Sequence, residues 1–299
     1  VQTCALPILL YNVTTMATTW HSLATQDIRL LKQQMDVVNT LPKEYTFLNY
    51  LRCHDDIGWG LDFDTLKWWG MEEVSHKRYL NDFFTGKYEG SVSRGELYND
   101  DPVTQDARFC GTTASMCGVE SAGFEQDEEK MEKAVGLDLM LHAYMFTQSG
   151  IPMLYSGDEI GQVNDYSYKG NPLKREDSRY LHRGAFHWDL AAKRGHADTV
   201  EGKIFMGLNR LEKLRRQEAV FDTKASVYTY DVHDDSILCI MRERDGEKFF
   251  GIFNFSSQDR TAWMQEDGEY RNLMTGEKME MKDVQVPGHG FVWAKRGIV

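Results

Sequence analysis

The sequence predicts an α/β protein, namely the C-terminal part of a (β/α)8 TIM barrel with an inserted subdomain, followed by an antiparallel β-sandwich domain. Three observations lead to this fold class. Short apolar segments typical of buried strands alternate with amphipathic helical segments. Each of these strands runs directly into chemically active side chains, as in a barrel whose functional loops follow the strand carboxyl ends. After Phe221 the pattern changes to short strands separated by Asp/Gly turns.

The first elements are a helix over residues 11 to about 38, where apolar residues recur at helical spacing, and a buried strand at 46–51. Pro42 ends the helical pattern. The opening residues 1–8 (VQTCALPI) back-translate to a short-read sequencing adapter. We interpret them as an assembly artefact at the cut end of a gene fragment and exclude them from the fold.

The next strand and helices lie beyond a long insert. The insert is expected over residues 57–125, of which 60–125 show no regular spacing of apolar residues. A loop of this length inside a domain is usually functional or a small subdomain. A helix is expected at 128–149, closed by Gly150, then a strand at 151–155 and a basic amphipathic helix at 202–217. Because only two barrel strands are recognised, the chain is expected to hold the last part of a barrel, over residues 9–220.

Residues 221–299 are expected to form the separate β domain. Strands are predicted at 226–232, 236–242, 248–253 and 284–294. The turns between them are expected at 233–235, 245–246 and 266–268. The aromatic residues Trp263, Trp293 and Tyr270 could form a stacking platform for a ligand, but packing in the core is the expected use.

Composition excludes several classes of partner. The net charge of −12 favours neither nucleic acid nor an anionic membrane surface, and no apolar run is long enough to span a membrane. The 5 cysteines are scattered and odd in number, which indicates neither a disulfide framework nor a zinc site. We therefore expect a reducing, cytoplasmic location and no metal or organic cofactor.

The chemistry is concentrated in His54-Asp55-Asp56, at the end of the first predicted strand. Glycosyl transfer with retention needs two carboxyl groups, and its oxocarbenium-like transition state gains from hydrogen bonds to the ring hydroxyls. An Asp and a neutral His at a strand carboxyl end can supply such bonds. On its own, a His-Asp pair is more commonly a solvated polar turn.

Three further segments place charged side chains in loops that follow predicted strands or lie in the insert. GIPMLYSGDEIG at 150–161 joins the second strand to a carboxylate-bearing turn, DSRYLHR at 177–183 brings guanidinium groups, and DAR at 106–108 brings another. Arg108 and Arg179 are the candidates from these loops, although a single Arg is more often part of a surface ion pair. Together these residues would surround one barrel mouth.

The segments HDDIGW, GIPMLYSGDEIG and DSRYLHR resemble glycoside hydrolase family 13, the α-amylase family, and most closely the amylosucrases. The resemblance runs from about Leu10 to the C-terminus. It implies that Asp55 is the transition-state-stabilising Asp and that His54 binds hydroxyls of the glucosyl ring. It further implies that Asp56 and Arg108 contact the acceptor or fructosyl side and that Arg179 helps close the bottom of the pocket; we assign Glu159 a structural role.

Two departures from that family stand out. Lys77-Arg78 occupy a place where amylosucrases tend to carry an Arg and then a neutral residue, which leaves acceptor preference open. No segment resembles the motifs of the nucleophile Asp and the acid/base Glu, which the family carries on earlier strands. We therefore expect a fragment that hydrolyses and transfers nothing alone, from a parent that transfers glucosyl groups from sucrose to α-glucan.

Several alternatives stay open. Within the family these are α-amylase, sucrose hydrolase, sucrose phosphorylase and trehalose synthase. A metal-dependent HD phosphohydrolase would need further His and Asp ligands on helices, and no such set is seen. A non-enzyme reading is an inactive relative that serves as an interaction subunit, against which the retained His54, Asp55 and Arg179 argue. The oligomeric state is not predicted.

Overall fold

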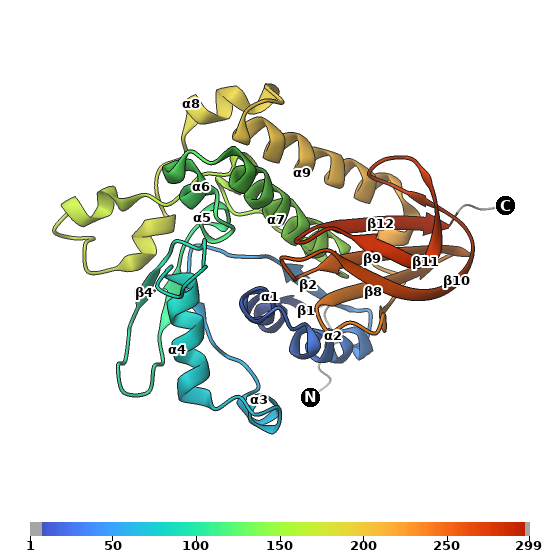
Figure 1. The fold of residues 1–299 in the computed structure, drawn as a ribbon, viewed down its shortest axis with the longest axis horizontal. Coiled ribbons are helices and arrows are strands. Elements are labelled where there is room, and N and C mark those ends of the chain that lie inside the picture. The colour runs from blue at the N-terminus through green and yellow to red at the C-terminus, as the bar shows by residue number, and fades with distance from the viewer. Residues whose placement is uncertain (1–7, 297–299) are drawn as a thin grey trace, which may run out of the picture. The chain divides into compact units, whose positions relative to one another are not determined.

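The computed structural model describes residues 8–296 and, at Ile8, the backbone alone (Figure 1). The chain forms two compact units. The first comprises the chain up to Tyr50, His142–Met153 and the chain from Arg210 onward, and the second comprises Leu51–Leu141 and Leu154–Asn209. Except for Ile8, the expected artefact at residues 1–8 lies outside the described residues.

Three parallel strands in the first unit belong to the barrel part of the fold. They are β1 (Ile8–Tyr11), β2 (Tyr45–Asn49) and β6 (Ile151–Pro152), hydrogen-bonded in the order β1-β2-β6. The sequence predicted the second and third of these strands and missed β1, part of which was excluded with the opening residues. The barrel of the expected fold class is thus present only in part in the described residues.

The expected single helix over residues 11–38 is wrong, because the chain forms α1 (Val13–Thr25) and α2 (Arg29–Thr40) instead. Gln26 between them is left-handed, with φ of 55°, which no helix interior accommodates. Asp27 Oδ1 then accepts a hydrogen bond from the Arg29 amide at 3.0 Å, and this bond stabilises the first turn of α2. Apolar spacing continues across the break, which is why periodicity alone did not detect it.

A buried polar cluster ties the carboxyl ends of the first two strands to the long helix α7 (Glu128–Thr147). Asn12 Nδ2 donates to Asn49 Oδ1 at 2.8 Å and to Gln148 Oε1 at 3.2 Å. Gly150 then turns the chain into β6 with φ of 116°, and a Cβ there would lie 2.3 Å from the Phe47 carbonyl oxygen. The predicted closure of this helix by Gly150 is wrong, because α7 ends at Thr147 and the steric need for glycine belongs to the turn into β6.

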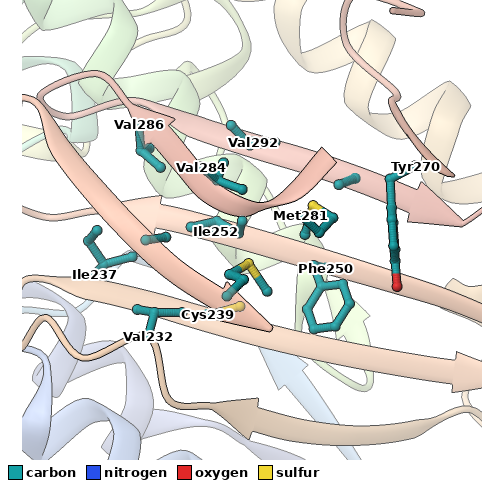
Figure 2. Packing of buried hydrophobic residues seen from close by; sticks show 13 residues of the cluster. Val232, Ile237, Cys239, Phe250, Ile252, Tyr270, Met281, Val284, Val286 and Val292 are labelled. Atoms are coloured by element: carbon teal, nitrogen blue, oxygen red, sulfur yellow. The ribbon is translucent and has the colours of Figure 1, made fainter. Parts of the chain in front are cut away.

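The expected C-terminal β domain is present as one six-stranded antiparallel sheet, in the order β11-β10-β12-β9-β8-β7. Its strands are β7 (Ser226–Tyr230), β8 (Ile237–Arg244), β9 (Glu247–Asn254), β10 (Arg260–Asn272), β11 (Lys278–Val286) and β12 (Phe291–Arg296). The sequence predicted a sandwich of two sheets. The structure instead folds the β10–β11 end of one continuous sheet over its own face (Figure 2).

Two details of that domain differ from prediction. The expected turn at residues 266–268 lies inside β10, where the pairing with β11 shifts register after Trp263 and again after Glu266. The expected strand 284–294 is the end of β11 and most of β12, separated by Pro287 and the residues that follow it. In the first case an Asp-Gly sequence that would make a turn serves as a bulge, because a long-range partner strand continues the ladder.

The core of the β domain lies between the folded-over β10–β11 end and the strands behind it. Met281 and Val284 of β11 belong to one buried cluster with Phe250, Ile252 and Cys239 of β9 and β8 (Figure 2). Tyr270 and Trp293 are also buried, with exposed fractions of 1% and 0%, as predicted for core aromatics.

Arg242 is a fully buried cation beneath this sheet. Its guanidinium donates to the carbonyl oxygens of Val220 at 2.6 Å, Thr147 at 2.8 Å and Asp222 at 3.0 Å. Burial, with a contribution from Arg215, lowers the pKa of Arg242 to about 9. The side chain thereby donates to the last carbonyl of α7 and to two carbonyls at the 3-10 helix η5 (Ala219–Phe221), of which that of Asp222 also accepts from the Ala225 amide at 3.0 Å.

The second unit contains the insert and the remaining loops. Aromatic packing of Trp59, Phe84 and Phe109 gives the insert its core, with Phe84 and Phe109 stacked at 4.6 Å. Its three-stranded sheet has the order β3-β5-β4. The elements of the insert are β3 (Ile57–Gly58), α3 (Phe63–Trp68), α4 (Glu73–Phe84), β4 (Glu96–Tyr98), β5 (Arg108–Cys110), α5 (Thr113–Met116) and α6 (Val119–Glu125).

The segment after β6 is mostly irregular up to the basic helix α9 (Val200–Gln217). Its short elements are the 3-10 helices η1 (Asp158–Ile160), η2 (Tyr166–Gly170), η3 (Ser178–His182) and η4 (Ala192–Gly195) and the helix α8 (Trp188–Ala191). None of the helices in the described part of the chain is both long enough and apolar enough to cross a membrane.

Candidate functional site

The predicted triplet begins five residues after β2 ends, and its first two side chains are open to solvent. The His54 and Asp55 side chains are 67% and 57% exposed, and His54 Nε2 lies 3.5 Å from Asp55 Oδ2. The Asp56 side chain is only 9% exposed. Two groups are thus available to a ligand, and the third is held inside the second unit.

A buried ion pair anchors the chain just before the triplet. Arg52 Nη2 lies 2.7 Å from Asp158 Oδ1, Arg52 Nε donates to the same oxygen at 2.8 Å, and the two side chains are 2% and 3% exposed. The Tyr155 ring lies 4.5 Å from the guanidinium carbon. The pair joins the loop that follows β2 to the loop that follows β6. The GDE turn is recognisable in the sequence, but no local pattern predicts this role for Arg52 or Asp158.

The end of the segment 177–183 supports the triplet directly, through residues other than the predicted one. Arg183 Nε donates to the His54 carbonyl oxygen, and its Nη2 lies 3.5 Å from Asp55 Oδ1. His182 Nε2 lies 3.3 Å from the same carbonyl. The DSRYLHR motif contained both residues, but nothing in its pattern distinguishes them from Arg179.

Burial, reinforced by the positive charge of Arg52, lowers the pKa of His182 to about 4. The imidazole is therefore neutral at pH 7, and the bond to His54 requires its proton on Nε2. Its Nδ1 is buried and has no hydrogen-bond partner among the described residues. A neutral donor thus positions the His54 backbone without adding charge to the site.

Arg179 binds its own loop instead of the triplet. Its Nε and Nη2 each donate to one carboxylate oxygen of Asp177 at 2.8 Å, and its guanidinium carbon lies 4.5 Å from the centre of the Tyr98 ring. This bidentate bond raises the pKa of Arg179 and holds the pKa of Asp177 below its usual range. The expected pocket-closing role of Arg179 is neither supported nor contradicted by these contacts.

Arg108 reaches Asp56 through strand pairing. Because Gly58 on β3 pairs with Arg108 on β5, the Arg108 Nη1 lies 3.5 Å from Asp56 Oδ2. The neighbouring Asp106 is held by Lys77, whose Nζ lies 3.2 Å from its Oδ1. The Lys77 residue that departs from the resembled family therefore has a defined contact in the insert.

Four charged residues of these loops act on one buried thiol, that of Cys110. Burial raises the pKa of Cys110, and Asp56 and Asp177 raise it further, while Arg179 and Arg183 act in the opposite direction. These four charged residues are thus near enough to one atom to influence its ionisation. The structure pairs Arg108 with Asp56 and Arg179 with Asp177, while Arg183 contacts His54 and Asp55.

One set of side chains has the donor types of a metal site. The candidate ligand atoms of Cys53, His54 and Asp55 lie within 4.8 Å of one another. Burial raises the pKa of Cys53, which disfavours the thiolate that a metal requires. The absence of a metal cofactor stays a prediction.

The arrangement offers hydrogen-bonding and electrostatic groups suited to a polyhydroxylated ligand. A carboxylate and an imidazole of one turn are exposed to solvent, and the Arg183 guanidinium contacts that turn. Such a site can bind ring hydroxyls and stabilise developing positive charge on a sugar.

Comparison with known proteins finds similarity in sequence over parts of the chain and similarity in fold over nearly all of it. The model of the family described as Bacterial Alpha amylase C-terminal domain matches residues 229–289. The glucosylglycerate phosphorylase of Escherichia coli (strain K12) is 26% identical over 132 residues, which are 44% of this chain and 22% of that protein.

Solved structures extend the similarity in fold over nearly all of the chain. Sucrose 6F-phosphate phosphorylase from Thermoanaerobacter thermosaccharolyticum has a TM-score of 0.60 at 17% identity, over 92% of this chain and 46% of that one. AmyP in complex with maltose has a TM-score of 0.62 at 10% identity, over 96% of this chain and 49% of that one. Cyclic α-maltosyl-(1→6)-maltose hydrolase from Arthrobacter globiformis has a TM-score of 0.53 at 14% identity, over 97% of this chain and 45% of that one.

The chain spans less than half the length of each of these relatives. The expected resemblance to the α-amylase family is supported over residues 229–289 by the family model, while amylosucrase specificity is not tested. Residues 229–289 resemble the C-terminal domain of bacterial α-amylases in sequence, and the chain as a whole is similar in fold to the three solved structures.

Proposed function

We propose that this chain is the C-terminal portion of a retaining, α-glucan-active glycosidase or transglucosidase, of the amylosucrase type, which transfers glucosyl groups from sucrose to α-glucan. The observation that carries the proposal is the exposed His54–Asp55 pair beyond β2, which Arg183 contacts from the loop beyond β6. Barrel enzymes assemble their sites from loops of this kind.

Each residue of the site has a proposed role. Asp55 stabilises the oxocarbenium-like transition state, and His54 binds hydroxyls of the glucosyl ring. Asp56 and Arg108 face the acceptor or fructosyl side, for which their 3.5 Å ion pair provides a fixed donor and acceptor. Arg179, whose guanidinium is held by Asp177, is proposed to close the bottom of the pocket.

The nucleophile and the acid/base are proposed to lie outside these 299 residues. A retaining mechanism needs both carboxyl groups, about 5 Å apart. The proposed organisation is a partial barrel over residues 9–220 with an inserted subdomain at 57–125 and a β domain at 221–299. The four described cysteines are free thiols, which supports the proposed cytoplasmic location.

A second candidate is glucosyl transfer to phosphate. Two of the similar proteins are named as phosphorylases. The guanidinium of Arg108, which is 57% exposed, and the partly exposed Arg183 are groups that bind phosphate well. In this reading the glucosyl acceptor is inorganic phosphate in place of a glucan.

One product analysis distinguishes these reactions. The parent protein, expressed from its complete reading frame, is incubated with sucrose and maltoheptaose, with and without inorganic phosphate. The proposal predicts lengthened glucan with little free glucose, and no dependence on phosphate. Glucose 1-phosphate formed only with phosphate would favour the second candidate, and no consumption of sucrose would refute both. The 299-residue chain alone should consume no sucrose, and turnover by it would contradict its proposed inactivity.

A further inference from the structure

The outer face of the β10–β11 hairpin carries a hollow of about 520 Å³, a size common for small-ligand sites. Trp263, Gln265 and Asp267 of β10, Lys282 and Asp283 of β11, and His233 contribute to its lining. All of these residues belong to the first unit, and none of them belongs to the proposed glucosyl site.

Trp263 is the largest apolar side chain in the lining of the hollow, and it is 53% exposed. Its neighbours along β10, Ala262 and Met264, are buried in the core cluster. Because alternate residues of a strand face opposite sides, the indole must point outward. The expected core role therefore holds for Trp293 and Tyr270 but is wrong for Trp263.

The backbone around Trp263 is fixed from two sides. Its amide donates to the Val232 carbonyl oxygen at 3.2 Å, and the residue is paired with Asp283 on β11. The register shift between Trp263 and Glu266 is a β-bulge, which increases twist and redirects side chains. An exposed aromatic ring is thus presented on a rigid strand, as a stacking surface requires.

Polar side chains without a hydrogen-bond partner among the described residues surround the Trp263 ring. Among the described residues, the side chains of Asp283, Lys282 and Gln265 have no hydrogen-bond or ion-pair partner. Glu266 differs, since its Oε2 accepts from Lys248 at 3.0 Å and from Tyr270 at 3.2 Å. The hollow therefore combines one apolar face with a carboxylate, an amide and an ammonium group that are free to bind a ligand.

This chemistry favours a neutral, hydroxyl-rich ligand over other classes. The carboxylates of the hollow do not converge as a cation site, because the triad at residues 53–55 is the single such group found among the described residues. The acidic lining disfavours phosphates and other polyanions. A purely apolar ligand would leave the polar rim desolvated and unpaired. A pyranose ring has an apolar face for the indole and hydroxyls for the rim.

We propose that the hollow at Trp263 is a second carbohydrate-binding site, in which one sugar ring of an α-glucan chain stacks on the indole. Asp283 and Gln265 accept and donate hydrogen bonds to the ring hydroxyls. The choice of an α-glucan over other neutral oligosaccharides rests on the proposed function. The site holds the glucan on the β domain and takes no part in bond cleavage.

The test is oxidative footprinting of the 299-residue chain with N-bromosuccinimide, in which mass spectrometry follows each tryptophan separately. Saturating maltoheptaose should slow oxidation of Trp263 by about tenfold, since stacking covers the exposed ring. Trp68, which is 87% exposed and lies in the second unit, is the internal control and should oxidise at an unchanged rate. Equal rates at Trp263 with and without maltoheptaose would overturn the proposal.

Variants separate this site from the glucosyl pocket. Calorimetric affinity for maltoheptaose should fall about tenfold in Trp263→Ala and be largely kept in Trp263→Phe, which retains an aromatic face. In Asp55→Asn, protection of Trp263 should be unchanged. Loss of protection in Asp55→Asn would contradict a separate site while leaving the proposed function standing. Cellohexaose protecting Trp263 as well as maltoheptaose does would overturn the α-glucan assignment.

Discussion

Replacing Asp158 by Asn removes the negative charge that faces Arg52 and leaves a cation buried without a counter-charge. The two side chains are 2% and 3% exposed and meet at 2.7 Å. At an effective dielectric constant near 20 their attraction is about 6 kcal/mol, part of which offsets the cost of taking both charges out of water. Since Arg stays protonated in proteins, Asp158→Asn should destabilise the second unit by about 3 kcal/mol.

Hydrogen exchange of peptides covering residues 51–60 and 154–162 is the suitable assay, because a chain of two compact units need not unfold in one transition. The double variant Arg52→Met/Asp158→Leu removes both charges and should recover most of the loss. The exposed pair Glu129–Lys133, with side chains 80% and 70% exposed, is the matched control. Glu129→Gln should cost less than about 0.5 kcal/mol. A loss below about 1 kcal/mol in Asp158→Asn, or a double variant no more stable than the single one, would refute the reasoning.

Two further predictions concern buried groups. Because the pKa of His182 falls from 6.5 to about 4 on folding, the unfolded chain binds a proton between those pH values and the native chain does not. The free energy of unfolding should therefore decrease as pH falls from 6.5 to 4, by up to about 3 kcal/mol. In urea titrations, His182→Gln should lose this pH-dependent part of the free energy of unfolding. An unchanged slope of that free energy against pH in His182→Gln would contradict the prediction. Arg242→Met removes the donor of the Val220 and Thr147 carbonyl oxygens, while that of Asp222 keeps the Ala225 amide, and should cost at least about 3 kcal/mol in urea unfolding. Arg242→Lys should recover little because it lacks the planar fork. Full stability of Arg242→Lys would show that the fork is unimportant.

The sequence predicted elements whose signals are local. The Asp245–Gly246 turn follows from two residues that tolerate left-handed backbone, and both have positive φ, 51° and 84°. An equally good Asp-Gly signal at residues 267–268 failed, because β11 pairs along the whole of β10 and converts the local turn into a bulge. Local sequence cannot report which distant strand will pair with it.

The same distinction applies to the site. The position of His54 and Asp55 after a strand is a local signal, and it identified the two exposed groups. The contacts that hold them come from Asp158, His182 and Arg183, more than a hundred residues further along the chain. In the sequence, Arg179 and Arg183 are equivalent candidates. Only the fold of the 3-10 helix η3 decides that Arg183 contacts the triplet and that Arg179 binds Asp177.

The central claim is that Asp55 stabilises a glucosyl transition state, and the rate of sucrose consumption by the parent protein tests it most directly. Asp55→Asn keeps the shape of the side chain and removes its charge, so kcat should fall by about a hundredfold or more. Asp64→Asn, at an exposed Asp of α3 outside the site, is the matched control and should leave kcat unchanged. If Asp55→Asn lowers kcat no more than Asp64→Asn does, Asp55 has no such role and the account is wrong.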